Sequence, residues 1–320
     1  MKRNLTGLFF GCLIAALTMG LQTMGAQTMG AQTKTAATCG GHGDRGTMLV
    51  STDWLAQHLK DPNLVILAIG QQADYKEHIP GAISLPLDEL STKMEMGKLM
   101  LELPPIEQLH KALSEAGIHN DSHVVLYLSK DGVATMTRVY LTLDAVGLGA
   151  RTSILDGGLK TWKSENRPVT EAVAAIKPGK LDLCPQSDVI AGMDYVRSNI
   201  RHPGVTILDA RAEQFYTGQT AGKTHDGMDQ RKGHIPGAGN LRYSSLFDDQ
   251  GKFHSAEMLK TQFAAAGVKP GDKVVSYCHI GQQATVVYFA ARYLGYDARM
   301  YDGSWDEWSA HEELPVEVSK

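Results

Sequence analysis

The sequence predicts an α/β protein of two similar domains, each a parallel sheet flanked by helices on both faces. Its 320 residues are enough for about two domains of ordinary size, and 43% of them are apolar, which supports sizeable hydrophobic cores. Short β-branched runs alternate with segments of helical spacing, as is typical of parallel sheets. Several motifs occur twice in the same order, which indicates a duplicated domain.

The second half of the chain shows the alternation most clearly. Residues 205–208 form a short apolar run expected to be a strand, 256–266 have helical spacing, 273–277 are strand-like, and 284–294 again have helical spacing. In the first half, the continuous apolar run 124–128 fits a strand buried on both faces. Both halves therefore predict strands covered by helices.

Repeated motifs define the two domains. His-Ile-Pro-Gly-Ala at 78–82 returns at 234–238, Ala-Gly-Ile at 116–118 returns as Ala-Gly-Val at 266–268, and Asp-Gly-Gly at 156–158 returns as Asp-Gly-Ser at 302–304. We predict domains at 48–169 and 188–320. The segment 170–187 is predicted to be the linker because chain breakers and polar residues dominate it.

The N-terminus has the pattern of a secretory signal. Lys2 and Arg3 precede a short apolar run, 5–21, which Gly and Thr residues interrupt, so a permanent membrane span is not expected. We predict a signal peptide and leader at 1–31, a flexible Gly-rich segment at 32–47, and a periplasmic or secreted protein.

Composition narrows the function classes. The formal net charge of -4 gives no basic excess for nucleic acid. The four cysteines, Cys12, Cys39, Cys184 and Cys278, form no CxxC pair. Cys39 and His42 are too few ligands for a closed metal site, so neither a metal nor a cofactor is expected. Cys184 lies in the predicted linker and has no basic neighbour, which favours a structural or incidental role.

Cys278 is the candidate nucleophile. It follows a predicted strand, and the residues after it, His279, Ile280, Gly281, Gln282 and Gln283, lead into a predicted helix. Ligands bind at the carboxyl ends of parallel strands, and a loop before a helix offers free backbone N–H groups and the positive end of the helix dipole. These features favour an anion such as a thiolate. The alternative is a buried, inert cysteine, which polar neighbours at 279 and 282–283 argue against.

Taken together, the motifs resemble the two-domain rhodanese family over nearly all of 51–315. Gly-His-Ile-Pro-Gly-Ala at 233–238 is similar to one family signature, Asp-Ala-Arg at 209–211 to its strand-end motif, and Tyr-Asp-Gly-Ser-Trp at 301–305 to its C-terminal signature. The loop 278–283 has the six-residue length of the family's active-site loop. The resemblance implies tandem rhodanese-like domains and a sulfurtransferase whose cysteine carries sulfur as a persulfide.

The first copy departs from this pattern. Aligning Ala134-Thr135 with Ala284-Thr285 places Leu128 at the position of Cys278, and leucine cannot carry sulfur. The Asp-Ala-Arg motif corresponds to Ala-Ile-Gly at 68–70. The first domain is therefore expected to be catalytically silent and to cover the site and support folding.

The resemblance also implies roles for individual residues. Backbone amides of the loop would stabilise the persulfide, and Arg211 would hold an anionic donor through its two-pronged guanidinium. Asp209 would have a structural role and tie either the loop or Arg211 in place. Arg242 is either a second donor-binding residue or a solvated surface arginine. His279 would add positive charge or orient the donor, and a general-base role is the less favoured reading because a thiolate needs no base.

The expected reaction moves sulfur from a small donor to cyanide or a thiol. Thiosulfate is preferred as the donor because His279 is a possible cation and the loop lacks a Gly-Ser pair typical of mercaptopyruvate enzymes; 3-mercaptopyruvate is the alternative. A phosphatase would need a longer loop followed by arginine, where this chain has Ala284 and Thr285. A non-catalytic binding module remains the other alternative, and the protein is expected to be a monomer.

Overall fold

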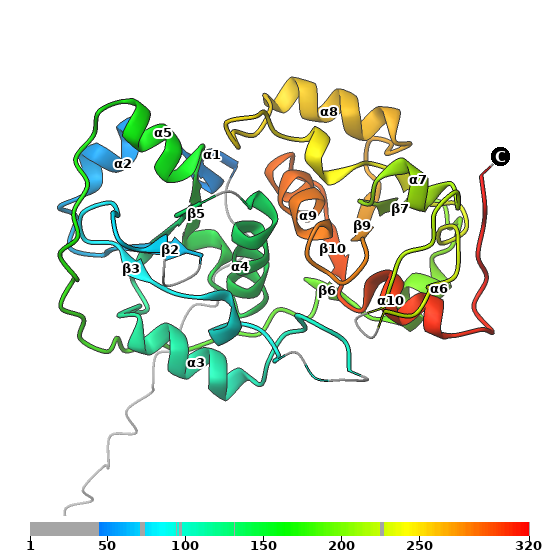
Figure 1. The fold of residues 1–320 in the computed structure, drawn as a ribbon, viewed down its shortest axis with the longest axis horizontal. Helices are drawn as coiled ribbons and strands as arrows, with labels where there is room; N and C mark the ends of the chain where they lie inside the picture. The colour runs from blue at the N-terminus through cyan, green and yellow to red at the C-terminus, as the bar shows by residue number, and fades with distance from the viewer. Residues whose placement is uncertain are drawn as a thin grey trace, which may run out of the picture. The chain divides into compact units, whose positions relative to one another are not determined.

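Two five-stranded parallel sheets organise the described part of the chain, which comprises residues 45–70, 74–93, 95, 98–130, 132–224 and 227–319 of a computed structural model (Figure 1). The predicted signal peptide and leader, and residues 32–44 of the predicted flexible segment, lie outside the described residues. Helix α1 begins at Arg45, so residues 45–47 of that segment are helical. No helix among the described residues is long and apolar enough to cross a membrane.

The first sheet has the strand order β1-β5-β4-β2-β3. Its strands are β1 (Leu49–Val50), β2 (Leu64–Ile69), β3 (Ile83–Ser84), β4 (His123–Leu128) and β5 (Thr152–Leu155). The helices of this half are α1 (Arg45–Met48), α2 (Thr52–His58), α3 (Ile106–Glu115), α4 (Val133–Ala145) and α5 (Gly158–Ser164), with short 3-10 turns η2 (Leu87–Glu89) and η3 (Gly149–Arg151).

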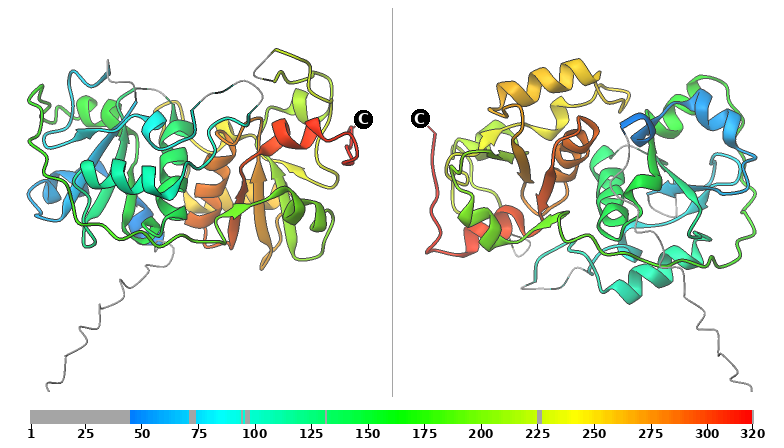
Figure 2. Two further views of the ribbon diagram at one scale, coloured as in Figure 1. Left: turned by 90° about the horizontal axis from the view of Figure 1, so that it is seen from below. Right: turned by 180° about the vertical axis from the view of Figure 1, so that it is seen from behind.

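The second sheet repeats this order as β6-β10-β9-β7-β8. Its strands are β6 (Ile190–Ala191), β7 (Val205–Asp209), β8 (Gly239–Asn240), β9 (Lys273–Tyr277) and β10 (Ala298–Tyr301). The helices are α6 (Met193–Ser198), α7 (Glu213–Tyr216), α8 (Ala256–Ala265), α9 (Ala284–Tyr293) and α10 (Ser304–Ala310), with the 3-10 turn η4 (Tyr243–Ser245). The predicted fold class is confirmed, and helices lie on both faces of each sheet (Figure 2).

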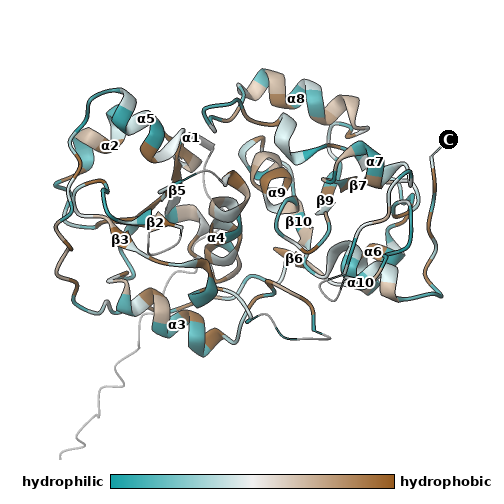
Figure 3. Ribbon diagram, in the orientation of Figure 1, coloured by the Kyte–Doolittle hydropathy of each residue, from teal (hydrophilic) through white to brown (hydrophobic). Residues whose placement is uncertain are grey.

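Burial explains why the strands read as continuous apolar runs. Successive residues of β4 point to opposite faces, so Val124 and Leu126 join one core while Val125 and Tyr127 join another. Helices at the periphery instead mix hydrophobic and hydrophilic residues, as α3 and α8 show (Figure 3). On α8, Leu259 and Phe263 are the buried residues, four positions apart on one face.

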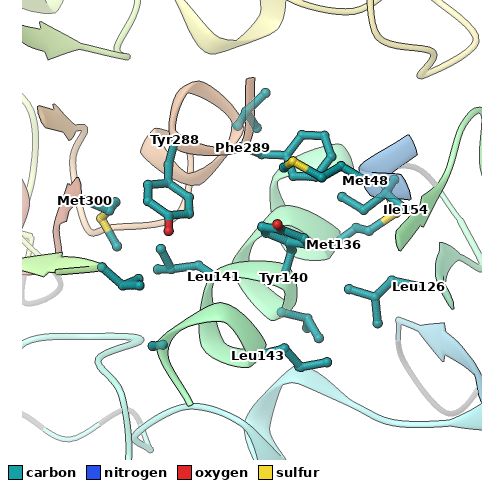
Figure 4. Close-up of a cluster of buried hydrophobic side chains, with 14 of the residues drawn as sticks. Met48, Leu126, Met136, Tyr140, Leu141, Leu143, Ile154, Tyr288, Phe289 and Met300 are labelled. Carbon is teal, nitrogen blue, oxygen red and sulfur yellow. The ribbon is translucent and has the colours of Figure 1, made fainter. Parts of the chain in front are cut away.

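The cores of the two halves are continuous through helices α4 and α9. One hydrophobic cluster contains residues of both, and Figure 4 shows side chains of α4 and α9 side by side in it. Tyr140 packs edge-on against Phe289, with ring centroids 4.8 Å apart, and the Tyr288 hydroxyl donates to Asp144 Oδ2 at 2.6 Å. Residues 136–145 of α4 are all buried, as expected for a helix enclosed on every side.

Between α5 and β6, residues 165–189 form no helix or strand. This stretch contains the predicted linker, and its later part packs against the end of α4. The Cys184 N–H donates to the Val146 carbonyl at 2.9 Å, and the Gln186 N–H donates to the Ala145 carbonyl at 2.7 Å. The segment is therefore held along the first domain by backbone hydrogen bonds.

Candidate active site

Cys278 is the residue directly after β9, and the loop 278–283 connects β9 to α9 (Figure 1). The Cys278 side chain is fully buried and carries a free thiol, whereas Cys184 is disulfide-bonded. Cys278 is therefore not the disulfide partner of Cys184. Burial alone would also suit an inert structural cysteine, so the character of the site depends on the surrounding loop.

Three carbonyl groups of the loop are held by donors outside it. Helix α10 supplies two of these donors, because the Trp305 N–H binds the Cys278 carbonyl at 3.0 Å and the Asp306 N–H binds the His279 carbonyl at 2.9 Å. The third is the guanidinium of Arg138, which donates to the Gly281 carbonyl at 3.0 Å. In a planar trans peptide group the N–H points away from the carbonyl. The next amide after each held carbonyl therefore faces the opposite side.

The loop amides are left without partners. The N–H groups of residues 279–283 donate no hydrogen bond to any described residue, although backbone N–H groups in proteins are nearly always paired. Helix α9 begins at Ala284, immediately after the loop, and adds the positive end of its dipole. Unpaired amides beside a helix N-terminus suit an anion.

Two backbone conformations make this loop possible. Gly281 has φ +75°, and a Cβ there would lie 2.6 Å from the Asp302 carbonyl oxygen, so only glycine fits. Ser304 is buried and also has a positive φ of 52°. Its hydroxyl accepts the Cys278 N–H at 3.2 Å and donates to the Tyr301 carbonyl at 2.9 Å. Sequence reasoning did not single out Ser304, although the Asp-Gly-Ser-Trp motif contains it.

Asp209 and Arg211 form a buried ion pair at the end of the neighbouring strand. Arg211 Nε lies 2.9 Å from Asp209 Oδ1, its Nη2 lies 2.6 Å from Oδ2, and Nη2 also donates to the Gly233 carbonyl at 2.7 Å. The guanidinium stacks over Trp305 at 4.5 Å from the ring centroid, and Tyr277 donates to Asp209 at 2.8 Å. Asp209 thus holds Arg211 in place.

Asp209 and Gly233 bind the Nε–Nη2 edge of the Arg211 guanidinium, whereas Nη1 has no hydrogen-bond partner among the described residues. The expected role of Arg211 in holding an anionic donor stays a prediction. Its charge still acts on the site. Burial opposes that charge, but Asp209 outweighs burial and raises the pKa of Arg211, and Cys278 raises it further. Arg211 therefore keeps its positive charge, which Asp209 holds in place near Cys278.

His279 is not the cation that the sequence suggested. Burial, and then the positive charge of Arg211, lower its pKa from 6.5 to about 4. The ring is therefore neutral at pH 7, and it packs edge-on against Phe215 with centroids 4.6 Å apart. A positive charge on His279 therefore no longer supports thiosulfate as the preferred donor.

Replacing His279 by asparagine is expected to change the pH dependence of stability. The unfolded chain binds a proton at His279 below about pH 6.5 and the folded protein only near pH 4, so the wild type loses stability as the pH falls through this window. Its contribution is at most about 3 kcal/mol, from 1.36 kcal/mol per pKa unit. Urea unfolding at pH 4.5 and 7.5 should show a smaller difference for His279→Asn than for wild type; equal differences would contradict a neutral, partly buried ring.

The remaining predicted site residues divide into two groups. Gln282 belongs to the loop and its Nε2 donates to Thr135 Oγ1 at 3.2 Å, while Gln283 Oε1 is buried without a partner among the described residues. Ile280 is partly buried in the same loop. Arg242 is exposed at the start of η4, and its side chain has no hydrogen bond or ion pair with a described residue, as a solvated surface arginine would.

The corresponding loop of the first domain lacks these features. Tyr127 pairs with Ala68 as Tyr277 pairs with Asp209, so the registers place Ala68 and Gly70 at the positions of Asp209 and Arg211. Leu128 follows Tyr127 as Cys278 follows Tyr277. The thiol and the buried ion pair are both missing, so this half has no counterpart of the candidate nucleophile.

The repeated His-Ile-Pro-Gly-Ala motif has a structural role in both domains. The Ile79 N–H donates to the Tyr127 hydroxyl at 3.4 Å, and the Ile235 N–H donates to the Tyr277 hydroxyl at 3.1 Å. His234 stacks on Tyr216 with centroids 3.9 Å apart. The motif therefore holds the last residue of β9 in the second domain, and the equivalent tyrosine of β4 in the first, by a hydrogen bond. Only in the second domain is that tyrosine followed by a cysteine.

Fold and site together define a tandem-domain α/β protein that presents one buried thiol in an amide-lined loop at the carboxyl end of a parallel sheet. The family model for the rhodanese-like domain matches the chain twice, at residues 51–165 and 193–311. The chain therefore belongs to the rhodanese family.

Curated relatives carry two kinds of name. A probable 3-mercaptopyruvate sulfurtransferase of Pseudomonas aeruginosa is 30% identical over 281 residues, 84% of this chain and 97% of its own length. A thiosulfate sulfurtransferase of Azotobacter vinelandii is 29% identical over 266 residues, 82% and 94% of the two chains. The crystal structure of SseA from Escherichia coli, described as a 3-mercaptopyruvate sulfotransferase, matches with a TM-score of 0.70 at 26% identity, over 81% of this chain and 99% of its own.

Proposed function

We propose that this protein is a sulfurtransferase in which Cys278 carries sulfur as a persulfide, with thiosulfate as the donor. The thiolate attacks the outer sulfur of thiosulfate, a new S–S bond forms, and the bond to the sulfonate sulfur breaks, so that sulfite leaves with the electron pair. Cyanide or a thiolate then attacks the outer sulfur of the persulfide and regenerates the Cys278 thiolate. This is covalent catalysis in two half-reactions.

The observation that carries the proposal is the set of unpaired amides around a buried thiol. The persulfide is an anion in both half-reactions, and the N–H groups of residues 279–283, with the N-terminus of α9, supply fixed dipoles that need no reorganisation. The charge of Arg211 adds to this stabilisation. An inert buried cysteine would not need a loop whose amides are left unpaired.

Thiosulfate is proposed because it is a dianion, and the unpaired loop amides and the N-terminus of α9 favour an anion beside the thiol. One observation favours 3-mercaptopyruvate as a second candidate: a neutral His279 leaves one cation fewer for a dianion. The relatives bear names of both kinds. The chain has Ala284 and Thr285 where a phosphatase would need an arginine, which supports sulfur transfer over phosphate chemistry.

A direct comparison of donors tests the proposal. The full chain is assayed for thiocyanate with cyanide and either thiosulfate or 3-mercaptopyruvate, and intact mass is recorded after donor alone. We expect a mass gain of one sulfur atom, ping-pong kinetics and a higher kcat/KM with thiosulfate. A higher value with 3-mercaptopyruvate would replace the donor. No persulfide and no turnover with either donor would contradict sulfur transfer.

We also propose that the protein is exported to the periplasm or secreted. The basic start and short apolar run at the N-terminus support this location, and the disulfide at Cys184 is of a kind that forms in oxidising compartments. Fractionation of cells that express the full chain, with N-terminal sequencing of the mature protein, tests it; a cytoplasmic, uncleaved protein would contradict it. A monomer that binds no nucleic acid stays a prediction.

A further inference from the structure

Arg138 is a buried arginine on α4 of the silent domain that reaches across to the Cys278 loop. Its side chain is fully buried, and Nη1 donates both to the Gly281 carbonyl at 3.0 Å and to Asp302 Oδ1. Nη2 lies 3.3 Å from Asp302 Oδ2, and the Leu103 N–H from the silent domain binds the same oxygen at 3.3 Å. A single guanidinium thus joins the loop to the end of β10.

The contact with Gly281 fixes the direction of one loop amide. The Gly281 carbonyl and the Gln282 N–H belong to the same planar peptide group and point in opposite directions. Because Arg138 holds the carbonyl, the Gln282 N–H faces away from α4, and it has no partner among the described residues. A charged donor on the carbonyl also polarises the peptide group and strengthens its N–H as a donor.

Neighbouring residues of α4 support the same loop. Gln282 Nε2 donates a hydrogen bond to Thr135 Oγ1 at 3.2 Å, and the Thr137 and Thr285 hydroxyl oxygens lie 2.7 Å apart. The catalytic domain holds the Cys278 and His279 carbonyls through its own helix α10, but the Gly281 carbonyl depends on the other domain. The silent domain therefore completes the loop.

From these contacts, we propose that Arg138 is a positioning residue of the Cys278 site, which aims and polarises the Gln282 amide toward the sulfur through the Gly281 carbonyl. The inference rests on the proposed sulfur transfer, and it gives the silent domain a defined part in that reaction. The hydrogen bonds of the Arg138 guanidinium go to Gly281 and Asp302 and not to Cys278, so its loss should lower kcat and leave KM nearly unchanged.

The variant Arg138→Lys tests this role. Lysine keeps a positive charge beside Asp302 but cannot serve the carbonyl and both carboxylate oxygens at once. We expect kcat to fall about tenfold to a hundredfold with KM within about twofold. Alkylation of Cys278 by iodoacetamide should shift to higher pH, and amide hydrogen exchange of residues 279–283 should become faster. The last two readouts need no sulfur donor, so they test Arg138 even if the proposed reaction is wrong.

Arg292→Lys is the matched control. Arg292 is a buried arginine of α9 near the same interface, with Nε 3.8 Å from Asp144, and it has no hydrogen bond to the loop. The Arg292→Lys variant should leave kcat, the pH dependence of Cys278 alkylation and the amide exchange of residues 279–283 unchanged. Equal losses in both variants, or none in a folded Arg138→Lys, would overturn the proposal. Should Arg138→Lys fail to fold, Arg138→Met combined with Asp302→Asn removes both buried charges together and is expected to give the same shifts.

Discussion

Replacement of Cys278 by alanine is expected to abolish sulfur transfer, with kcat/KM at least about a thousandfold below wild type, because no other group at the site can carry the sulfur. The silent domain cannot substitute, since Leu128 stands at the equivalent position. Thiocyanate formation with the better donor measures the loss. The variant should also show no mass gain after incubation with donor.

The loss is expected without unfolding. Removing one buried sulfur atom costs only about 1 kcal/mol of stability through the small cavity that it leaves. Urea unfolding of Cys278→Ala should therefore stay within about that amount of wild type, and Cys278→Ser provides a near-isosteric control that also lacks activity. Turnover above a tenth of the wild-type rate in a folded Cys278→Ala protein would show that another residue carries the sulfur.

Replacement of Asp209 by alanine is expected to lower the free energy of unfolding by about 3–5 kcal/mol. Asp209 and Arg211 are 0% and 1% exposed, so the substitution leaves a buried guanidinium without its counter-charge. Tyr277 loses the acceptor of its hydroxyl as well. Activity should fall in the molecules that remain folded, because Arg211 would no longer be held beside the thiol.

Urea denaturation with linear extrapolation measures this cost. Lys273→Ala is the matched control, since Lys273 belongs to an ion pair with Asp297 at an exposed end of the same sheet, at 2.9 Å. Exposed pairs contribute little, so this variant should show no measurable change. A loss below about 1 kcal/mol for Asp209→Ala would contradict the view that the buried pair is an essential part of the fold near Cys278.

The two domains differ because only the second has the candidate nucleophile and the buried ion pair near it. The silent domain has the same sheet order and the same tyrosine fastening before its loop, but it has neither thiol nor buried ion pair. Its helix α4 shares a core with α9 and holds the Gly281 carbonyl. The first domain therefore lacks the candidate nucleophile but contributes contacts to the loop that carries it.

The sequence by itself determined the fold class and the position of the candidate nucleophile. Continuous apolar runs such as 124–128 can only be buried on both faces, and the predicted segments 273–277 and 284–294 became β9 and α9 to within one residue. The motif order located Cys278 between them. These features are local or periodic patterns of residues, so they can be recognised in the sequence without the structure.

Only the tertiary structure decided the charge and the partners of the site. The sequence allowed His279 to be a cation, and burial with the neighbouring charge of Arg211 makes it neutral. The edge of the Arg211 guanidinium that Asp209 binds was likewise decided only by the fold. Arg138 gave no signal, because 143 residues separate it from Gly281. Desolvation and long-range hydrogen bonds depend on which residues are packed together in the folded chain. The sequence alone does not show this packing.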